Sequence, residues 1–178
     1  MAVDIIFETH SISVDNERGI ATGWLPGRLS ETGRQLAREL GERRRSQGVA
    51  SVFTSDLQRA VETAQIAFGD SGIPIYTDPR LRECNYGALN GMPVAELETQ
   101  RSRHINEPFP GGESYGQATE RVRDFLEELS RDWAGQQVIV IGHAATRFAL
   151  DHFVNGVPLE DLVAAPFEWQ PGWHYVLR

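Results

Sequence analysis

The chain has 178 residues, of which 40% are hydrophobic and 24% charged, and its formal net charge is -8. These values are typical of a globular protein with a buried core. The acidic excess argues against nucleic-acid or membrane partners, which bind basic surfaces. The single cysteine, Cys84, excludes an internal disulfide and a cysteine-based metal cluster. With no signal-peptide pattern and no apolar run of about 18 residues, we expect a cytoplasmic protein with one domain over residues 1–178.

The first apolar run covers residues 3–7 and is followed at once by polar residues. Its β-branched and aromatic side chains predict a buried strand, so His10 would stand at the carboxyl end of that strand. In open α/β sheets, ligands bind at this edge. A polar loop follows and includes Asn16, Thr22 and Gly23. A single histidine in such a place is more often structural than catalytic, so His10 alone does not indicate an active site.

Helices and strands alternate in the next part of the chain. The pattern predicts a helix over residues 31–46 with Ser30 as its N-cap, a strand over 50–54, a helix over 57–68 and a strand over 73–77. Three arginines at residues 43–45 place positive charge near the C-terminal end of the first helix. Alternation of this length is typical of right-handed βαβ units. We therefore predict an α/β fold with a largely parallel central sheet.

The second half of the chain continues this pattern after an irregular stretch. Residues 78–91 and 106–114 read as loops, and the length and glycines of the second loop indicate a functional segment or a lid. The remaining expected elements are a short helix around residues 93–97, a long helix after Ser114, a strand over 137–141, a helix from Ala144 and a last strand over 173–177.

Three of the predicted strands end on residues that bind anions or move protons: Thr9-His10, Ser55-Asp56 and Gly142-His143. If these strands are parallel, His10 and His143 face each other at one edge of the sheet. Arg59, in the first turn of the next helix, can point toward the same edge. Two imidazoles, a guanidinium and the free N–H groups of helix starts together form an anion pocket. We therefore expect a small anionic substrate despite the acidic net charge.

These motifs, in this order, resemble those of the histidine phosphatase superfamily, also called phosphoglycerate mutase-like, over nearly the whole chain. His10 falls at the nucleophilic histidine of the family, and Asn16 with Thr22-Gly23-Trp24 matches the loop that follows it. The other matching segments are LSETG at 29–33, SDLQRA at 55–60 with TA at 63–64, LRE at 81–83 with Gly87 and Gly91, PGGES at 110–114 and VIGH at 140–143.

The resemblance implies a three-layer α/β/α sandwich and covalent catalysis without a metal or a cofactor. His10 would attack phosphorus and form a phosphohistidine, while Glu83 protonates the leaving alkoxide and later activates water. His143 and Arg59 would stabilise charge on the phosphoryl oxygens. The substrate-binding residues that the resemblance implies are Thr9, Ser11, Asn16, Thr22, Gly23, Arg59 and Ala144.

The first motif departs from the family pattern. Members carry Arg-His-Gly where this chain has Thr9-His10-Ser11. The arginine helps to clamp the phosphoryl group, and the loss of one preorganised donor can cost about 10²–10³ in rate. Three explanations are open. The site works with fewer charges, or Arg18 or Arg147 supplies the missing one, or phosphate is not the ligand.

We therefore predict a phosphatase that hydrolyses a small phosphate monoester, with two alternatives. One is a degenerate member of the family that binds a ligand or a partner without catalysis. The other is an enzyme that uses His10, His143 and Glu83 for acid–base chemistry on a substrate without a phosphoryl group. A mutase is less favoured, because the mutases of the family tend to have a longer segment between Glu83 and His143. Neither the substrate nor the oligomeric state follows from the sequence.

Overall fold

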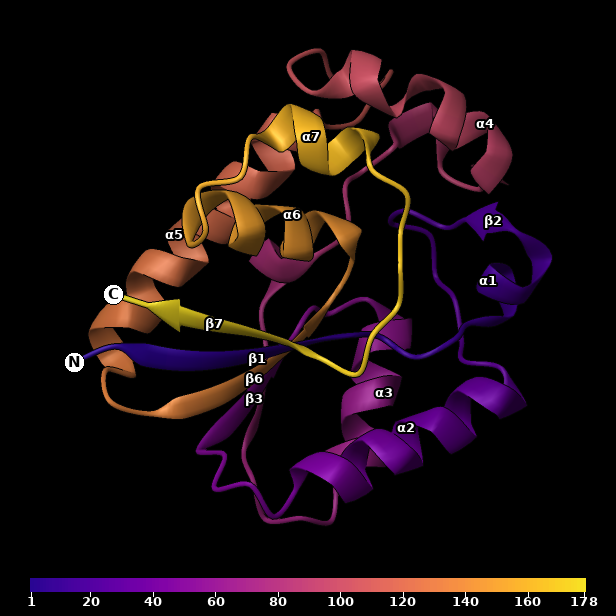
Figure 1. The fold of residues 1–178 in the computed structure, drawn as a ribbon. Coiled ribbons are helices and arrows are strands. Elements are labelled where there is room, and N and C mark those ends of the chain that lie inside the picture. The colour runs from indigo at the N-terminus through magenta and orange to yellow at the C-terminus, as the bar shows by residue number, and fades with distance from the viewer.

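The computed structural model describes residues 1–178 and contains a central sheet with the strand order β4-β3-β6-β1-β7. The strands are β1 (Val3–Thr9), β3 (Ser51–Thr54), β4 (Ile75–Thr77), β6 (Gln137–Gly142) and β7 (Trp173–Leu177). Four of them are parallel, and only β7 pairs antiparallel, with β1. That pairing brings the two ends of the chain together (Figure 1). The predicted, largely parallel sheet is confirmed.

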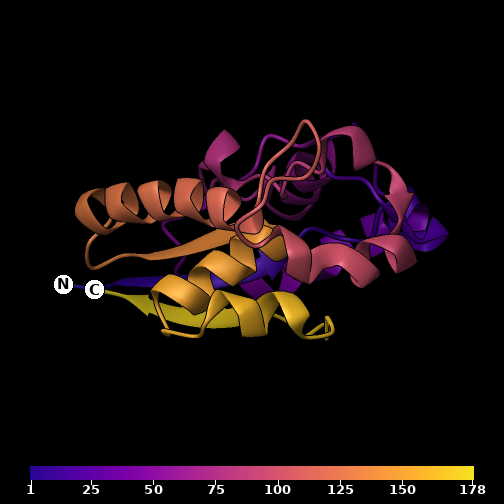
Figure 2. The ribbon, with the colours of Figure 1, turned by 90° about the horizontal axis from the view of Figure 1, so that it is seen from above.

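Helices cover both faces of this sheet, because the buried strands carry apolar residues on both sides. Helices α2 (Glu31–Arg44) and α3 (Gln58–Phe68) pack against one face, where Ile6 and Ile139 point. Helices α5 (Tyr115–Asp132) and α6 (Ala144–Phe153) pack against the other, where Ile5, Phe7 and Val138 point. The chain thus forms the three-layer α/β/α sandwich that the sequence predicts (Figures 1 and 2).

Several short elements lie on the side of the sheet away from the chain ends (Figure 1). They are α1 (Val14–Arg18), β2 (Ile20–Ala21), β5 (Met92–Pro93) and α4 (Val94–Gln100). The sequence predicted a polar loop where α1 and β2 form, and it gave no sign that β2 pairs with β5. Helix α7 (Leu159–Ala164) was also not predicted. No helix has the length and apolar content needed to cross a bilayer.

The predicted bounds of the main elements differ slightly from the observed ones. Helix α2 ends at Arg44 rather than at residue 46, and β4 begins at Ile75 rather than at residue 73. A turn precedes β4, since the Ile73 N–H donates to the Ser71 hydroxyl oxygen (3.1 Å), and Pro74 has no N–H for a sheet ladder. Residues 106–114 form no lid over the site, because Phe109 is buried in the core and Glu113 pairs with Arg121.

Two glycines allow the close packing that brings helices up to the carboxyl edge of the sheet. A Cβ on Gly33, in the first turn of α2, would overlap the Ile12 carbonyl oxygen. A Cβ on Gly142, the last residue of β6, would come 2.5 Å from the Thr146 Oγ1 atom. Side chains larger than hydrogen would push α2 and α6 away from the strand ends. Both helices therefore start directly beside the predicted site.

Candidate active site

The parallel register of β1 and β6 places two histidines next to each other. Thr9 lies opposite Gly142, so His10 and His143 each follow the last residue of neighbouring strands. The His10 N–H donates to the Gly142 carbonyl (2.9 Å), which extends the ladder by one bond. The centroids of the two imidazole rings are 5.1 Å apart. A single small ligand can therefore contact both rings.

His10 is held with one ring nitrogen free. Its Nδ1 lies 2.7 Å from the Ser11 carbonyl oxygen, which can only accept, so Nδ1 carries the proton and Nε2 has its lone pair available. Loss of solvent around the ring lowers the pKa of His10 to about 3; the positive charge of Arg59 acts in the same direction, and the bond to Ser11 opposes both. At neutral pH the His10 imidazole is thus uncharged, with a free lone pair on Nε2.

His143 is buried and also neutral. Its Nε2 lies 2.7 Å from the Ser55 hydroxyl, at the end of β3, whereas its Nδ1 is shielded from solvent and has no partner in the protein. Burial holds the pKa of His143 well below its usual value, and the positive charge of Arg59 adds to this effect. An unsatisfied buried nitrogen is costly, so a ligand that completes its hydrogen bond would be stabilised.

Arg59 places a buried positive charge in the same pocket. It lies in the first turn of α3, is 3% exposed, and forms no ion pair. Its Nη2 donates to the Gly23 carbonyl (2.9 Å), and its Nη1 has no partner. Burial lowers the pKa of Arg59, but a guanidinium keeps its charge at neutral pH. A buried cation that forms no ion pair favours the binding of an anion.

Glu83 sits at the N-terminus of α6. Its Oε1 accepts hydrogen bonds from the N–H groups of Cys84 (2.9 Å) and Ala145 (3.1 Å), and its Oε2 accepts one from Ala144 (3.3 Å). The positive end of the helix dipole and these donors fix the position of the carboxylate. Glu83 lines the same cavity as the two histidines, so its carboxyl group can exchange a proton with a ligand bound there.

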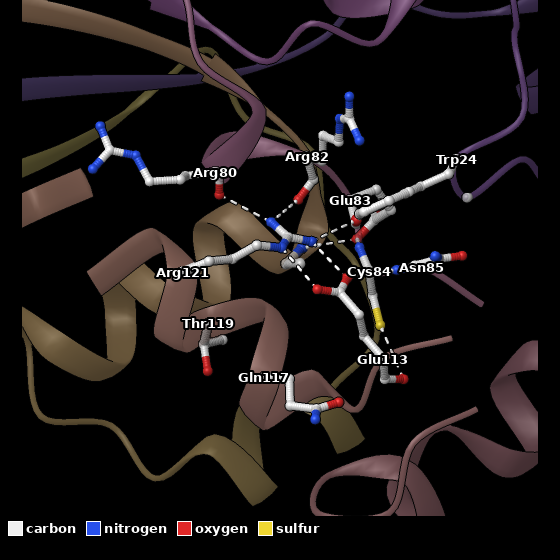
Figure 3. Close-up of polar contacts among 12 residues, drawn as sticks. Trp24, Arg80, Arg82, Glu83, Cys84, Asn85, Glu113, Gln117, Thr119 and Arg121 are labelled. Atoms are coloured by element: carbon white, nitrogen blue, oxygen red, sulfur yellow. Dashed lines mark hydrogen bonds and ion pairs between the residues drawn. The ribbon is translucent and has the colours of Figure 1, made fainter. Parts of the chain in front are cut away.

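The backbone that carries Glu83 is held by Arg121 of α5 (Figure 3). The Arg121 guanidinium donates to the carbonyls of Arg80 (2.9 Å), Arg82 (2.8 Å) and Glu83 (2.9 Å). It also donates to both carboxylate oxygens of Glu113 (2.9 and 2.8 Å). All these partners restrict the segment that carries Glu83. Sequence reasoning missed Arg121, since carbonyl acceptors leave no pattern in the sequence.

Trp24 fixes the same segment from the other side. Its Nε1–H donates to the Glu83 carbonyl (2.6 Å), and the Arg82 guanidinium lies 4.6 Å from the centre of its ring system. Arg82 in turn pairs with Asp56 through two contacts of 2.6 Å. These contacts tie the loop after His10, the end of β3 and the Glu83 segment together.

One cavity of about 690 Å³ connects His10, Arg59, Glu83 and His143. Every residue that the sequence predicted for the site lines it: His10, Glu83, His143, Thr9, Ser11, Asn16, Thr22, Gly23, Arg59 and Ala144. Besides His10, Arg59, Glu83 and His143, three of these residues have side chains that form hydrogen bonds within the protein. The Ser11 hydroxyl donates to the Gly33 carbonyl (2.6 Å), the Thr22 hydroxyl donates to Asp15 (2.8 Å), and the Asn16 Oδ1 accepts from the Ser13 N–H (2.9 Å).

Neither arginine considered as a replacement at Thr9 lines this cavity. Arg18 is exposed at the end of α1, and Arg147 pairs with Asp151 (3.1 Å). Two other arginines do line the cavity, Arg43 of α2 and Arg101 after α4. Much of the remaining wall is apolar and comes from α2, α4, α6 and the segment that joins α7 to β7; examples are Leu36, Leu97, Phe148 and Trp169.

Comparison with known proteins agrees with this arrangement. The profile of the histidine phosphatase superfamily (branch 1) matches residues 5–170. A probable phosphoglycerate mutase of Yersinia enterocolitica is 30% identical over 164 residues, which cover 88% of this chain and 76% of that protein. The solved structure of Bacillus stearothermophilus YhfR superposes with a TM-score of 0.84 at 27% identity, covering 95% of this chain and 88% of that one.

A mycobacterial glucosyl-3-phosphoglycerate phosphatase in its native form has a TM-score of 0.77 at 25% identity, covering 92% of this chain and 84% of the other. The profile match extends over nearly the whole chain and includes the strand ends that carry His10 and His143. The chain therefore belongs to the histidine phosphatase superfamily and has its phosphoglycerate mutase-like fold.

Proposed function

We propose that this protein hydrolyses a small phosphate monoester through a phosphohistidine intermediate on His10. One observation carries the proposal: the buried, unpaired guanidinium of Arg59 lies in the same cavity as a neutral imidazole whose Nε2 is free. This pair supplies an anion site and a nucleophile together. The phosphatase and mutase relatives support phosphoryl chemistry of this type.

In the first step, the Nε2 lone pair of His10 attacks phosphorus in line with the ester oxygen. The N–P bond forms as the P–O bond breaks, and Glu83 gives its proton to the departing alkoxide. The Nη1–H of Arg59 and the Nδ1–H of His143 donate to the phosphoryl oxygens, while the His143 Nε2 accepts from the Ser55 hydroxyl. Because His10 is already neutral, no proton has to leave the ring before attack.

In the second step, water attacks the phosphohistidine and Glu83 accepts a proton from it. The N–P bond breaks, inorganic phosphate leaves, and His10 returns to its neutral form. Glu83 regains the proton that it lost in the first step. The fixed position of its carboxylate at the start of α6 suits both transfers.

His10→Ala should abolish turnover and prevent labelling of the protein by the substrate phosphoryl group. The test is rapid acid-free quenching of wild type and variant with ³²P-labelled monoesters, followed by detection of acid-labile label. His174→Ala, on the exposed side of β7, is the matched control and should keep both activities. Turnover by the wild type without any label, or label that persists in His10→Ala, would contradict the covalent mechanism.

Glu83→Gln should slow the hydrolysis of alkyl phosphates by about 10²–10⁴-fold and that of 4-nitrophenyl phosphate far less, because only the alkoxide needs a proton to leave. Single-turnover rates with both substrates measure the difference. Glu98→Gln, an exposed change in α4, serves as control. Equal losses with both substrates would exclude Glu83 as the acid.

Thr9→Arg should raise phosphatase activity by about ten- to a hundred-fold, since an arginine at this position can bind the phosphoryl oxygens. Thr9 lines the cavity and is only half-buried, which leaves room for a longer side chain. The assay compares both proteins on a panel of phosphate monoesters, with melting temperatures recorded. A wild type inactive on the whole panel, with a variant that is inactive and less stable, would mean that the pocket serves another ligand.

A further inference from the structure

A charged cluster on the wall of the same cavity has no role in the steps above. It consists of Glu8 in β1 with Arg43 and Arg44 at the end of α2. Glu8 is 1% exposed, and its carboxylate binds both arginines: Arg44 Nε to Oε1 at 2.9 Å and Arg43 Nη2 to Oε2 at 3.0 Å. The cluster holds two positive charges and one negative charge.

Arg44 has a structural role. Its guanidinium is buried and forms further bonds to the Gln47 side chain (3.1 Å) and to the Pro171 carbonyl (2.8 Å). Gly172 packs directly against it, with a backbone angle φ of +95° that favours glycine. Arg44 thus offsets the charge of Glu8 and holds the segment that leads into β7.

The Arg43 guanidinium has N–H donors that are not used in the protein. Its bond to Glu8 is the only one it makes within the protein, and its Nε is shielded from solvent without any partner. The side chain is 31% exposed and lines the cavity. Glu39, one turn earlier, also lines the cavity, but it forms no ion pair with Arg43. The surplus positive charge of the cluster therefore faces the space where a ligand would bind.

The position of Arg43 along α2 separates it from the phosphoryl site. Helix α2 begins beside that site, where the Ser11 hydroxyl bonds to the Gly33 carbonyl. Arg43 comes ten residues after Gly33, and its guanidinium is held 3.0 Å from Glu8, which precedes His10 by two residues, or about 6–7 Å along the strand. One phosphoryl group on His10 is too small to reach both places. Arg43 is thus suited to a second anionic group of the same ligand.

The wall between these two places is apolar. Leu36 and Leu40 precede Arg43 on the face of α2 that lines the cavity, and Phe167 and Trp169 line it from the segment before β7. Both aromatic side chains are more than half exposed in this structure, which leaves their apolar surface available to a ligand. This part of the cavity fits an apolar body better than a polyhydroxylated one.

From these observations we infer that the substrate is the phosphate ester of an alcohol with an apolar body and a distal carboxylate, and that Arg43 binds this carboxylate. The inference rests on the proposed function, because it concerns the alcohol part of the same ester. The bond between Arg43 and Glu8 holds the guanidinium in place for the ligand, while Arg44 keeps Glu8 satisfied.

The test uses phosphonates, which cannot be hydrolysed and so report binding alone. A series of ω-phosphonoalkanoates of increasing chain length is compared by calorimetry with alkylphosphonates that lack the carboxylate. At the chain length that spans the two sites, the carboxylate should improve affinity by about ten- to a hundred-fold. Arg43→Gln should abolish this gain and leave the affinity for the matched alkylphosphonate unchanged, whereas Arg43→Lys should keep part of it.

Arg38→Gln is the matched control, because Arg38 is an exposed arginine of α2 outside the cavity, and this variant should keep the gain in full. Melting temperatures show whether each variant is folded. A gain that survives in Arg43→Gln, or that is lost only in Arg101→Gln at the α4 side, would overturn the inference. If the enzyme hydrolyses monoesters but the carboxylate does not improve the affinity for the phosphonates, the inference is wrong and the proposed function stands. If the protein neither binds phosphonates nor hydrolyses monoesters, the proposed function is wrong as well.

Discussion

The parallel register of the three inner strands is the constraint on which the rest of the site depends. Thr9 pairs with Gly142 and Thr54 with Ile141, so β1, β6 and β3 end at one level. The next residues of those strands are therefore His10, His143 and Ser55, and they meet without any long loop to position them. Helices α3 and α6 start from the same edge and bring Arg59 and the donors that hold Glu83.

Burial determines which of the side chains at this edge of the sheet are charged. Both imidazoles are neutral because they have lost solvent, and Arg59 keeps the full positive charge of the phosphoryl site. Thr9 contributes no charge to this edge. Arg43, which is held by Glu8, lines the same cavity. Under the proposed function and the inference on Arg43, one dianionic ester would contact both cations.

Much of this arrangement can be predicted from local sequence. The features that the sequence does not predict depend on partners that lie far away along the chain. The buried strands and the residues at their ends are visible because apolar runs stop abruptly at polar residues. The antiparallel direction of β7 and the pairing of β2 with β5 depend on distant partners, so no local pattern carries them. Arg121 binds backbone carbonyls, which every residue has, so its role leaves no mark in the sequence. Arg43 lies in the last turn of α2, where a positive charge is already explained by the helix dipole.

We infer that His10 is a neutral imidazole with its proton on Nδ1 and a free Nε2. Nitrogen-15 NMR of histidine-labelled protein, assigned with the His10→Ala variant, measures both the tautomer and the pKa. We expect the Nδ1–H tautomer at neutral pH. We also expect no protonation of His10 as the pH falls from 8 to about 5, since the pKa of His10 lies well below the usual value of about 6.5. Protonation of His10 near pH 6.5, or a proton on Nε2 at neutral pH, would contradict it.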